Sequence, residues 1–174
     1  MGFISSYVGV VVFTVIQFCV VVLVIIATPL SQLESMISRQ CYTFWGYKMI
    51  CSSLSHNLQG KIAFGNCTQR YNNMNGGAAF AIISIFTTIM ALVFGILMLL
   101  RISCTVILPL VFTCLSVITL MITWACVVGA FTLEMCDIRW SSLALKYGPG
   151  FGIMVTACCV QFINVVLLLL LSFC

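Results

Sequence analysis

The stretch that decides how this chain folds is Cys41-Tyr42-Thr43-Phe44-Trp45-Gly46-Tyr47-Lys48-Met49-Ile50-Cys51. Two cysteines bracket it, and residues 42–45 alternate as a short β-strand does until Gly46 interrupts the run. The stretch lies in the longest polar segment of an otherwise apolar chain. The sequence therefore predicts a small folded structure here, which the apolar remainder is expected to hold at a membrane surface.

The composition places the rest of the chain in lipid. Of its 174 residues, 63% are hydrophobic and only 6% are charged, whereas a soluble domain carries about 25% charged residues. The net charge of +4 comes from 7 basic and 3 acidic residues, which are too sparse for a nucleic-acid surface. We therefore expect one membrane domain over residues 1–174, with the lipid bilayer as its first partner and no nucleic acid.

Four apolar runs are long enough to cross about 30 Å of hydrocarbon as helices. The first is longer than a signal-peptide core, and no Lys or Arg precedes it, so a retained helix is expected. Only Arg101-Ile102-Ser103 separates the second run from the third, which predicts an antiparallel hairpin. The expected helices cover residues 8–27, 78–100, 104–131 and 151–172, and the polar loops cover residues 29–77 and 132–150, with turns at residues 72–77.

A few polar residues interrupt the apolar runs. Gln161 and Asn164 are one helical turn apart and should face the interior of the bundle, with Gln17 as their partner. The second and third runs also carry hydroxyls on one face, which favours hydrogen bonds between helices or, alternatively, a polar pathway for a solute. These hydroxyls belong to Ser84, Thr87, Thr88, Thr113, Ser116 and Thr123.

The cysteines divide into two groups by position. Seven lie in or against apolar runs, where cysteine behaves as a small hydrophobic residue. The other four lie in the polar loops, allow three pairings, and would be bridged in an oxidising compartment. Asn66-Cys67-Thr68 also fits the N-glycosylation pattern. The four loop cysteines are Cys41, Cys51, Cys67 and Cys136.

The charges and the cysteines disagree about which side of the membrane the loops face. The positive-inside rule places basic loops in the cytosol, where loop cysteines would stay reduced. The cysteines and the glycosylation pattern favour the exterior, and we expect the loops there. The loop cations are Arg39, Lys48, Lys61, Arg70, Arg139 and Lys146, against Arg101 alone on the other side.

The stretch from Cys41 to Cys51 resembles the signature of the amastins, surface glycoproteins of trypanosomatid parasites. In that signature a cysteine is followed by an apolar residue, Thr or Ser, an aromatic or apolar residue, Trp-Gly, and then a basic or amide residue before a second cysteine. Ile50 departs from the pattern, because the family usually has a polar or acidic residue there. The residues that fit are Cys41, Tyr42, Thr43, Phe44, Trp45, Gly46, Lys48 and Cys51.

The resemblance implies extracellular loops, cytoplasmic termini and a multi-pass plasma-membrane protein. Amastins are similar in turn to claudins, although here Trp45 lies between the cysteines rather than before them. That likeness implies a small antiparallel sheet in the first loop, stapled by a Cys41–Cys51 disulfide worth about 2.8 kcal/mol in loop entropy. Phe44 and Trp45 would pack on either side of the hairpin. Cys67 and Cys136 are the candidate second pair.

The expected fold is thus an all-α membrane protein: a four-helix transmembrane bundle with a small disulfide-stapled, β-containing extracellular cap. Residues for catalysis are missing. His56 is the single histidine, so neither a histidine metal cluster nor a catalytic triad is expected. The three carboxylates, Glu34, Glu134 and Asp137, lie in loops. We therefore expect no enzyme and no cofactor.

The favoured function is a non-catalytic surface glycoprotein whose extracellular loops contact another membrane or a host component. Exposed aromatic residues and the cations Lys48, Lys61 and Arg70 would serve that contact, the cations favouring anionic partners. One alternative is a small channel or transporter, which would need a homo-oligomer because four helices are few for a pore. The other is a claudin-like cell-contact protein.

Overall fold

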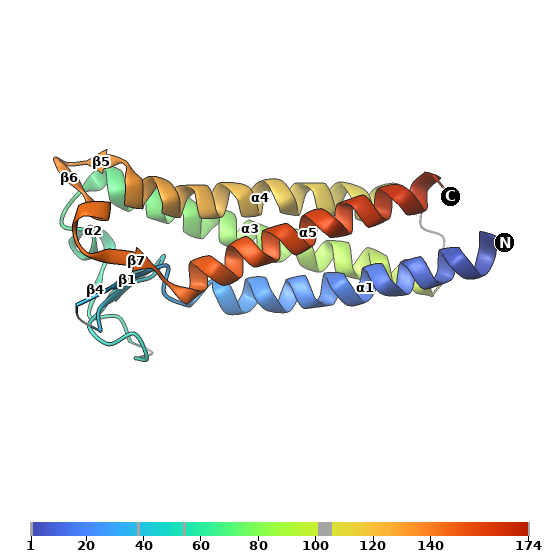
Figure 1. The fold of residues 1–174 in the computed structure, drawn as a ribbon, viewed down its shortest axis with the longest axis horizontal. Coiled ribbons are helices and arrows are strands. Elements are labelled where there is room, and N and C mark those ends of the chain that lie inside the picture. The colour runs from blue at the N-terminus through green and yellow to red at the C-terminus, as the bar shows by residue number, and fades with distance from the viewer. Residues whose placement is uncertain (1, 38, 54, 101–105, 174) are drawn as a thin grey trace.

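The computed structural model describes residues 2–37, 39–53, 55–100 and 106–173, and it consists of a helical bundle with a cap at one end (Figure 1). Four long helices form the bundle: α1 (Gly2–Ala27), α3 (Thr68–Leu99), α4 (Ile107–Thr132) and α5 (Pro149–Phe173). All four are long and apolar enough to cross a membrane. The beginning of α1 and the end of α5 lie together at the end opposite the cap. This architecture confirms the predicted fold class.

The second helix starts earlier than the sequence predicts. Residues 72–77 were expected to form turns, but they belong to α3, which begins at Thr68. Tertiary contacts outweigh the low helix propensity of Asn and Gly here. Met74 is fully buried, Asn73 Nδ2 donates to the carbonyl oxygen of Cys126 at 2.7 Å, and Gly77 lies against the Phe44 ring. The predicted turn at residues 101–103 and the start of the predicted third helix at residue 104 lie outside the described residues.

Both loops contribute strands to a single antiparallel sheet. The first loop supplies β1 (Leu33–Ser35), β2 (Cys41–Tyr42), β3 (Gly46–Lys48) and β4 (Leu58–Gln59), and the second supplies β7 (Leu145–Tyr147). The strand order is β4-β3-β2-β1-β7. Glu34 pairs with Cys41 on one side of β1 and with Lys146 on the other. The sequence predicted a sheet within the first loop, and the structure extends that sheet with a strand from the second.

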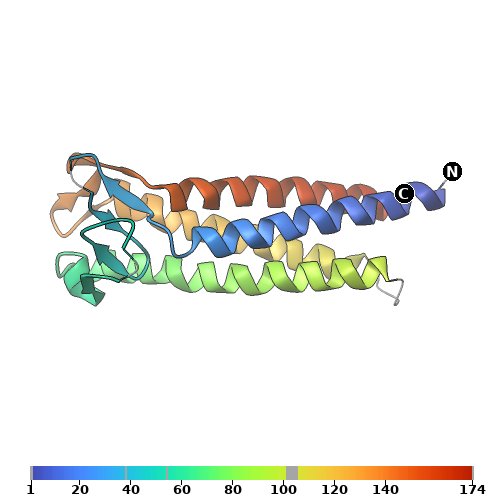
Figure 2. The same ribbon diagram turned by 90° about the horizontal axis from the view of Figure 1, so that it is seen from below.

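Four shorter elements complete the cap. The helix α2 (Gly60–Ala63) precedes α3, the strands β5 (Glu134–Met135) and β6 (Ile138–Arg139) form a hairpin after α4, and the 3-10 helix η1 (Trp140–Ser142) leads to β7. Figure 2 shows these elements gathered at one end of the bundle. The buried side chains of cap and bundle form one continuous apolar core, so the cap is fixed to the helices rather than tethered to them.

The junction between β7 and α5 needs glycine. The amide of Gly148 donates to the carbonyl oxygen of Gln32 at 2.8 Å, and the amide of Gly150 donates to the carbonyl oxygen of Ser31 at 2.9 Å. A Cβ atom at Gly148 would lie 2.5 Å from the Ser31 carbonyl oxygen, closer than nonbonded atoms approach. Pro149 occupies the first position of α5, where its missing N–H costs nothing. This close approach holds the start of α5 against the segment that follows α1.

Candidate functional site

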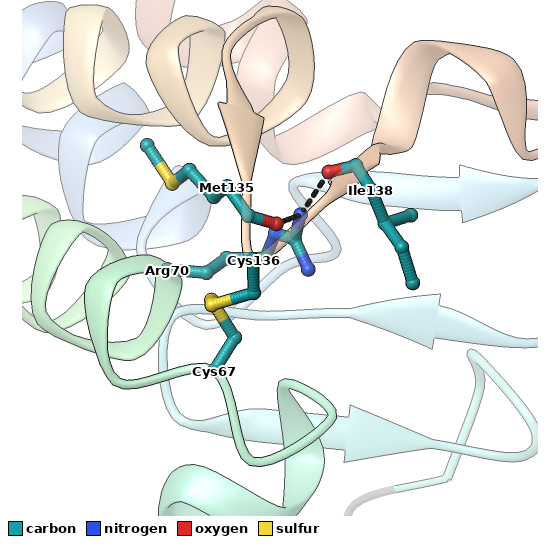
Figure 3. The surroundings of a disulfide bond; sticks show 5 residues. All are labelled: Cys67, Arg70, Met135, Cys136 and Ile138. Carbon is teal, nitrogen blue, oxygen red and sulfur yellow. Dashed lines mark hydrogen bonds between the residues drawn. A yellow bond between two sulfur atoms is a disulfide. The ribbon is translucent and has the colours of Figure 1, made fainter.

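A disulfide joins the two loops at the base of the cap. Cys67 and Cys136, which are 69 residues apart in the sequence, are bonded to each other. Cys67 is the residue before α3, and Cys136 lies in the turn between β5 and β6 (Figure 3). The bond therefore pins the β5–β6 hairpin to the start of α3. It is the candidate second pair of the sequence analysis.

Arg70 reinforces this disulfide from inside the cap. It lies one turn after Cys67 on α3, and only 3% of it is exposed. Its Nη2 donates to the carbonyl oxygens of Met135 at 2.9 Å and Ile138 at 2.7 Å (Figure 3). The guanidinium also lies 4.5 Å from the centroid of the Trp140 ring, within cation–π range. Arg70 was expected among the cations that favour anionic partners, but its side chain is buried and binds both carbonyls that flank the hairpin turn.

An aromatic cluster links the first loop to the second. The Tyr42 ring lies 4.5 Å from Trp140 and 5.2 Å from Tyr47, centroid to centroid. Phe64 adds a stacked contact to Trp140 at 6.2 Å. Burial, followed by the charge of Tyr47, raises the pKa of the Tyr42 phenol. The cluster stays neutral at physiological pH and contributes apolar area together with ring contacts of about 0.5–1.5 kcal/mol each.

The signature residues build a tight turn between β2 and β3. The Thr43 amide donates to the carbonyl oxygen of Gly46 at 2.9 Å, its hydroxyl lies 3.1 Å from the same oxygen, and the Trp45 amide donates to that hydroxyl at 3.2 Å. The predicted strand over residues 42–45 therefore ends at Tyr42, and Gly46 begins the next strand instead of only ending the first. A side-chain hydroxyl competing for backbone groups is the physical reason for the turn.

The other signature residues take separate roles around this turn. Phe44 is buried against α3, so that a Cβ on Gly77 would come within 2.9 Å of its ring. Trp45 is exposed, so the two aromatic residues do face opposite ways. Lys48 was expected among the cations that favour anionic partners, but it is buried, and its Nζ donates to the Ser53 carbonyl oxygen at 2.9 Å. The signature thus supports the cap structurally.

Replacing Gly46 by alanine is expected to destabilise the cap by about 1–3 kcal/mol, because an added Cβ must displace a neighbour. The Cβ would overlap the Leu58 carbonyl oxygen of β4, and φ is +156° at Gly46. Gly60→Ala is the matched control. Gly60 also has a positive φ, +66°, but no atom lies within 4 Å of its Cβ position, so only the backbone strain of about 1 kcal/mol applies. Hydrogen-exchange protection of β3 and β4 measures the loss of stability in each variant. An equal loss of protection in Gly46→Ala and Gly60→Ala would contradict the steric explanation.

Cys41 and Cys51 are neighbours but are not bonded in the structure, which differs from the expected Cys41–Cys51 disulfide. Both are thiols, and Cys51 Sγ donates to the Arg39 carbonyl oxygen at 3.2 Å. Burial, followed by a hydrogen bond with the Cys51 side chain, raises the pKa of Cys41 to about 12. Cys41 is therefore a neutral thiol at physiological pH, and the two sulfurs lie within hydrogen-bonding reach of each other.

The glycosylation candidate lies beside the disulfide. Asn66 is exposed and has a φ of +58°, and the following residue, Cys67, is buried in its bond to Cys136. The carboxamide is therefore on the surface of the cap, in a turn held by its neighbour.

The intramembrane polar residues meet inside the bundle. Asn164 Nδ2 donates to Gln17 Oε1 at 2.8 Å, Gln17 Nε2 donates to the Thr88 carbonyl oxygen at 3.1 Å, and Gln161 Nε2 donates to Ser116 Oγ at 2.6 Å. Of the hydroxyls expected to form hydrogen bonds between helices, Ser116 does so among the described residues, because its Oγ accepts from Gln161 of α5. Buried hydroxyls of α3 and α4 donate to carbonyl oxygens of their own helix, as at Ser84, Thr87, Thr88, Thr113, Ser116, Thr119 and Thr123.

The described residues contain no group of three or more His, Cys, Asp or Glu side chains suited to a metal ion. His56 Nε2 lies 3.0 Å from the Thr43 hydroxyl, so the histidine is part of the signature turn. Burial, followed by the charge of Lys48, lowers the pKa of His56. Its ring therefore stays mostly neutral at physiological pH.

The comparisons with known proteins agree with this arrangement. The profile of the Amastin surface glycoprotein family matches residues 18–168, from the first bundle helix to the last. No curated protein matches the chain. The matched range includes the signature turn, both cysteines of the disulfide, Gln161 and Asn164. The chain therefore belongs to the amastin family of surface glycoproteins, with four membrane-spanning helices.

Proposed function

We propose that the cap faces the exterior of the cell, that both termini are cytoplasmic and that the protein resides in the plasma membrane. The Cys67–Cys136 disulfide supports this orientation, since disulfides persist in oxidising compartments. The exposed Asn66 in its glycosylation pattern and the surface glycoprotein family agree with it. The six loop cations oppose it under the positive-inside rule, so the orientation needs a direct test.

Glycosidase treatment of the native protein should increase its electrophoretic mobility, and Asn66→Gln should abolish that shift. Protease applied to intact cells should cut the loops that contain Asn66 and Asp137. Cleavage only after permeabilisation would place the cap in the cytosol and overturn the proposed orientation, whether or not Asn66 is modified.

The function that the geometry supports best is non-catalytic recognition by the cap of a host or surface component. The observation that carries this proposal is an apolar tip, defined here as Met36, Ile37, Met49 and Ile50. Ile37 is 87% exposed and Met36 is 65% exposed, at the turn after β1, which leads away from the bundle (Figure 2). Met36 and Ile37 are neighbours in the sequence, as are Met49 and Ile50, and exposed apolar patches mark interaction sites.

The tip is held in place by both loops. The Met36 amide donates to the Ala144 carbonyl oxygen of the second loop at 2.9 Å, and the Cys51 amide donates to the Arg39 carbonyl oxygen at 3.1 Å. A cavity of about 370 Å³ opens beside it and includes Glu34, Arg39 and Ile50 in its lining. A preorganised apolar surface with polar groups at its edge loses little entropy on binding.

The experiment compares the adhesion of fluorescent proteoliposomes to host cells. Each apolar side chain buried in a contact contributes about 1.5–3 kcal/mol, so Met36→Ser with Ile37→Ser should lower adhesion at least tenfold. Ile62→Ser is the control, because Ile62 is 63% exposed on α2, outside the tip. Adhesion equal to that of the unchanged protein would contradict the proposal. Ion conductance across the same liposomes would favour the channel alternative, and clustering of expressing cells would favour a claudin-like contact.

Cys41 and Cys51 are proposed to form a second disulfide once the cap reaches an oxidising compartment. Cys51 is the partly exposed thiol of the pair and Cys41 is buried, so Cys51 would attack a small-molecule disulfide first. Cys41 would then displace the second small thiol, so that one disulfide is consumed and two thiols are released. This bond would staple β2 to the base of the apolar tip.

Protein from the cell surface should therefore yield a peptide linking Cys41 to Cys51 by mass spectrometry, and neither residue should be alkylated before reduction. After reduction, Cys51 should react before Cys41, whose pKa of about 12 leaves almost no thiolate at pH 7. Cys51→Ser is the control. In this variant only burial should limit the alkylation of Cys41. Free alkylation of Cys51 in the native protein would contradict the second bridge.

A further inference from the structure

Two short chains of hydrogen bonds converge on α5, about halfway along the bundle. In the first, Asn164 Nδ2 donates to Gln17 Oε1, and Gln17 Nε2 donates to the Thr88 carbonyl oxygen. In the second, Gln161 Nε2 donates to Ser116 Oγ, and Ser116 donates to the Thr113 carbonyl oxygen at 2.7 Å. The first chain joins α3, α1 and α5, and the second joins α4 and α5.

The carbonyl acceptor at the end of each chain of hydrogen bonds fixes the direction of all the bonds in it. A backbone carbonyl accepts hydrogen bonds but cannot donate. Gln17 must therefore present its nitrogen to Thr88 and its oxygen to Asn164. Ser116 must give its proton to Thr113 and accept from Gln161. These requirements set the orientation of all three amides, so the two atoms left at the ends of the chains are the amide oxygens of Asn164 and Gln161.

Both of these oxygens are buried and lack a donor. Gln17, Gln161 and Asn164 are fully buried, and Gln161 Oε1 and Asn164 Oδ1 have no hydrogen-bond partner among the described residues. A buried acceptor without a donor costs about 1–3 kcal/mol, and the surrounding lipid supplies none. The two side chains are three residues apart on one helix, so their Cβ atoms are about 5–6 Å apart. One small molecule with two donors can reach both oxygens.

We propose that a bound water molecule bridges Gln161 Oε1 and Asn164 Oδ1 and completes one polar network that joins all four helices. Water suits the site because it supplies two donors, and buried waters typically make about three hydrogen bonds. A free N–H on either amide can donate to the water oxygen. A metal cation suits it less, because a charge at this depth needs a counter-charge. The three acidic residues of the chain, Glu34, Glu134 and Asp137, all lie outside the long helices.

Water-to-amide magnetisation transfer tests the proposal in detergent micelles, with side-chain amides labelled with ¹⁵N. The Gln161 and Asn164 amides should show cross-peaks with water of the sign given by a long-lived bound molecule. Asn73 is the control amide, since its Nδ2 donates to a backbone carbonyl in another part of the bundle. Folded protein without water cross-peaks at Gln161 and Asn164 would overturn the proposal. Amide signals that move when sodium is replaced by a bulky organic cation, without water cross-peaks, would assign the site to a cation and also overturn it.

A double-mutant cycle supplies a second readout. If one water joins the two oxygens, Gln161→Leu and Asn164→Leu should not act independently. The double variant should raise the unfolding equilibrium constant about threefold less than the product of the single effects. Thr156→Val is the matched control on α5, because Thr156 is exposed and donates to its own helix. Strict additivity of the two substitutions would count against a shared water.

Discussion

Replacing Arg70 by alanine should destabilise the cap by about 3–5 kcal/mol, as expected when a buried, hydrogen-bonded charge is removed and leaves its partners unpaired. The substitution frees the carbonyl oxygens of Met135 and Ile138 and removes the cation–π contact with Trp140. Both losses fall on the β5–β6 hairpin and the segment leading to β7. Hydrogen exchange of residues 134–147 should increase by the largest factor in the protein.

Two further variants separate charge from geometry. Arg70→Lys keeps the positive charge but replaces the planar guanidinium with a single ammonium group, and should lose an intermediate amount of stability. Arg39→Ala removes an exposed arginine from the same cap and should change stability by less than about 0.5 kcal/mol. If Arg70→Ala is no more destabilising than Arg39→Ala, the buried contacts of Arg70 contribute nothing.

Removing the disulfide by Cys67→Ala with Cys136→Ala should destabilise the cap by about 2–4 kcal/mol. The loop-entropy relation gives about 4.4 kcal/mol for a sequence separation of 69. The effect should be smaller than that, because α3 and α4 remain packed together in the membrane and already limit the distance between their ends. SDS titration of the purified protein measures the loss.

Reduction of the unchanged protein should produce this loss together with the effect of breaking the proposed Cys41–Cys51 bridge, while reduction of the double variant should produce only the latter effect. Cys159→Ala is the matched control, because Cys159 is an exposed free thiol on α5, and should leave stability unchanged. A cap that keeps its exchange protection without the bond would show that Arg70 and the aromatic cluster are sufficient.

The sequence predicts those parts of this fold that depend on local composition. Apolar runs of about the required length mark the four helices, and the signature marks the cap. The sequence also predicts that the loop cysteines form disulfides, but their spacing alone does not decide which cysteines pair. Cys67 and Cys136 come together because α3 and α4 form a hairpin that returns the chain to the same side.

Contacts between distant segments account for what the sequence could not predict. The residues around Arg70 in the sequence do not indicate that its guanidinium will bind the carbonyl oxygens of residues 135 and 138. Its position three residues after a loop cysteine indicates only that it lies near that cysteine. Residues 72–77 look like turns, and only Phe44 and Cys126 packing on that face explain their helix. Likewise, β7 is a strand because β1 offers it an edge.

The pairing of β1 with β7 also sets an order of events during biosynthesis. Residues 33–35 leave the ribosome long before residues 145–147, and two membrane helices are made in between. In the orientation proposed above, β1 has an open edge in the lumen through that interval, together with an unpaired Cys67. Open strand edges invite pairing with other chains. The nascent protein should therefore depend on luminal chaperones and disulfide isomerases until the last helix is inserted, and truncation before residue 145 should leave it prone to aggregation and degradation.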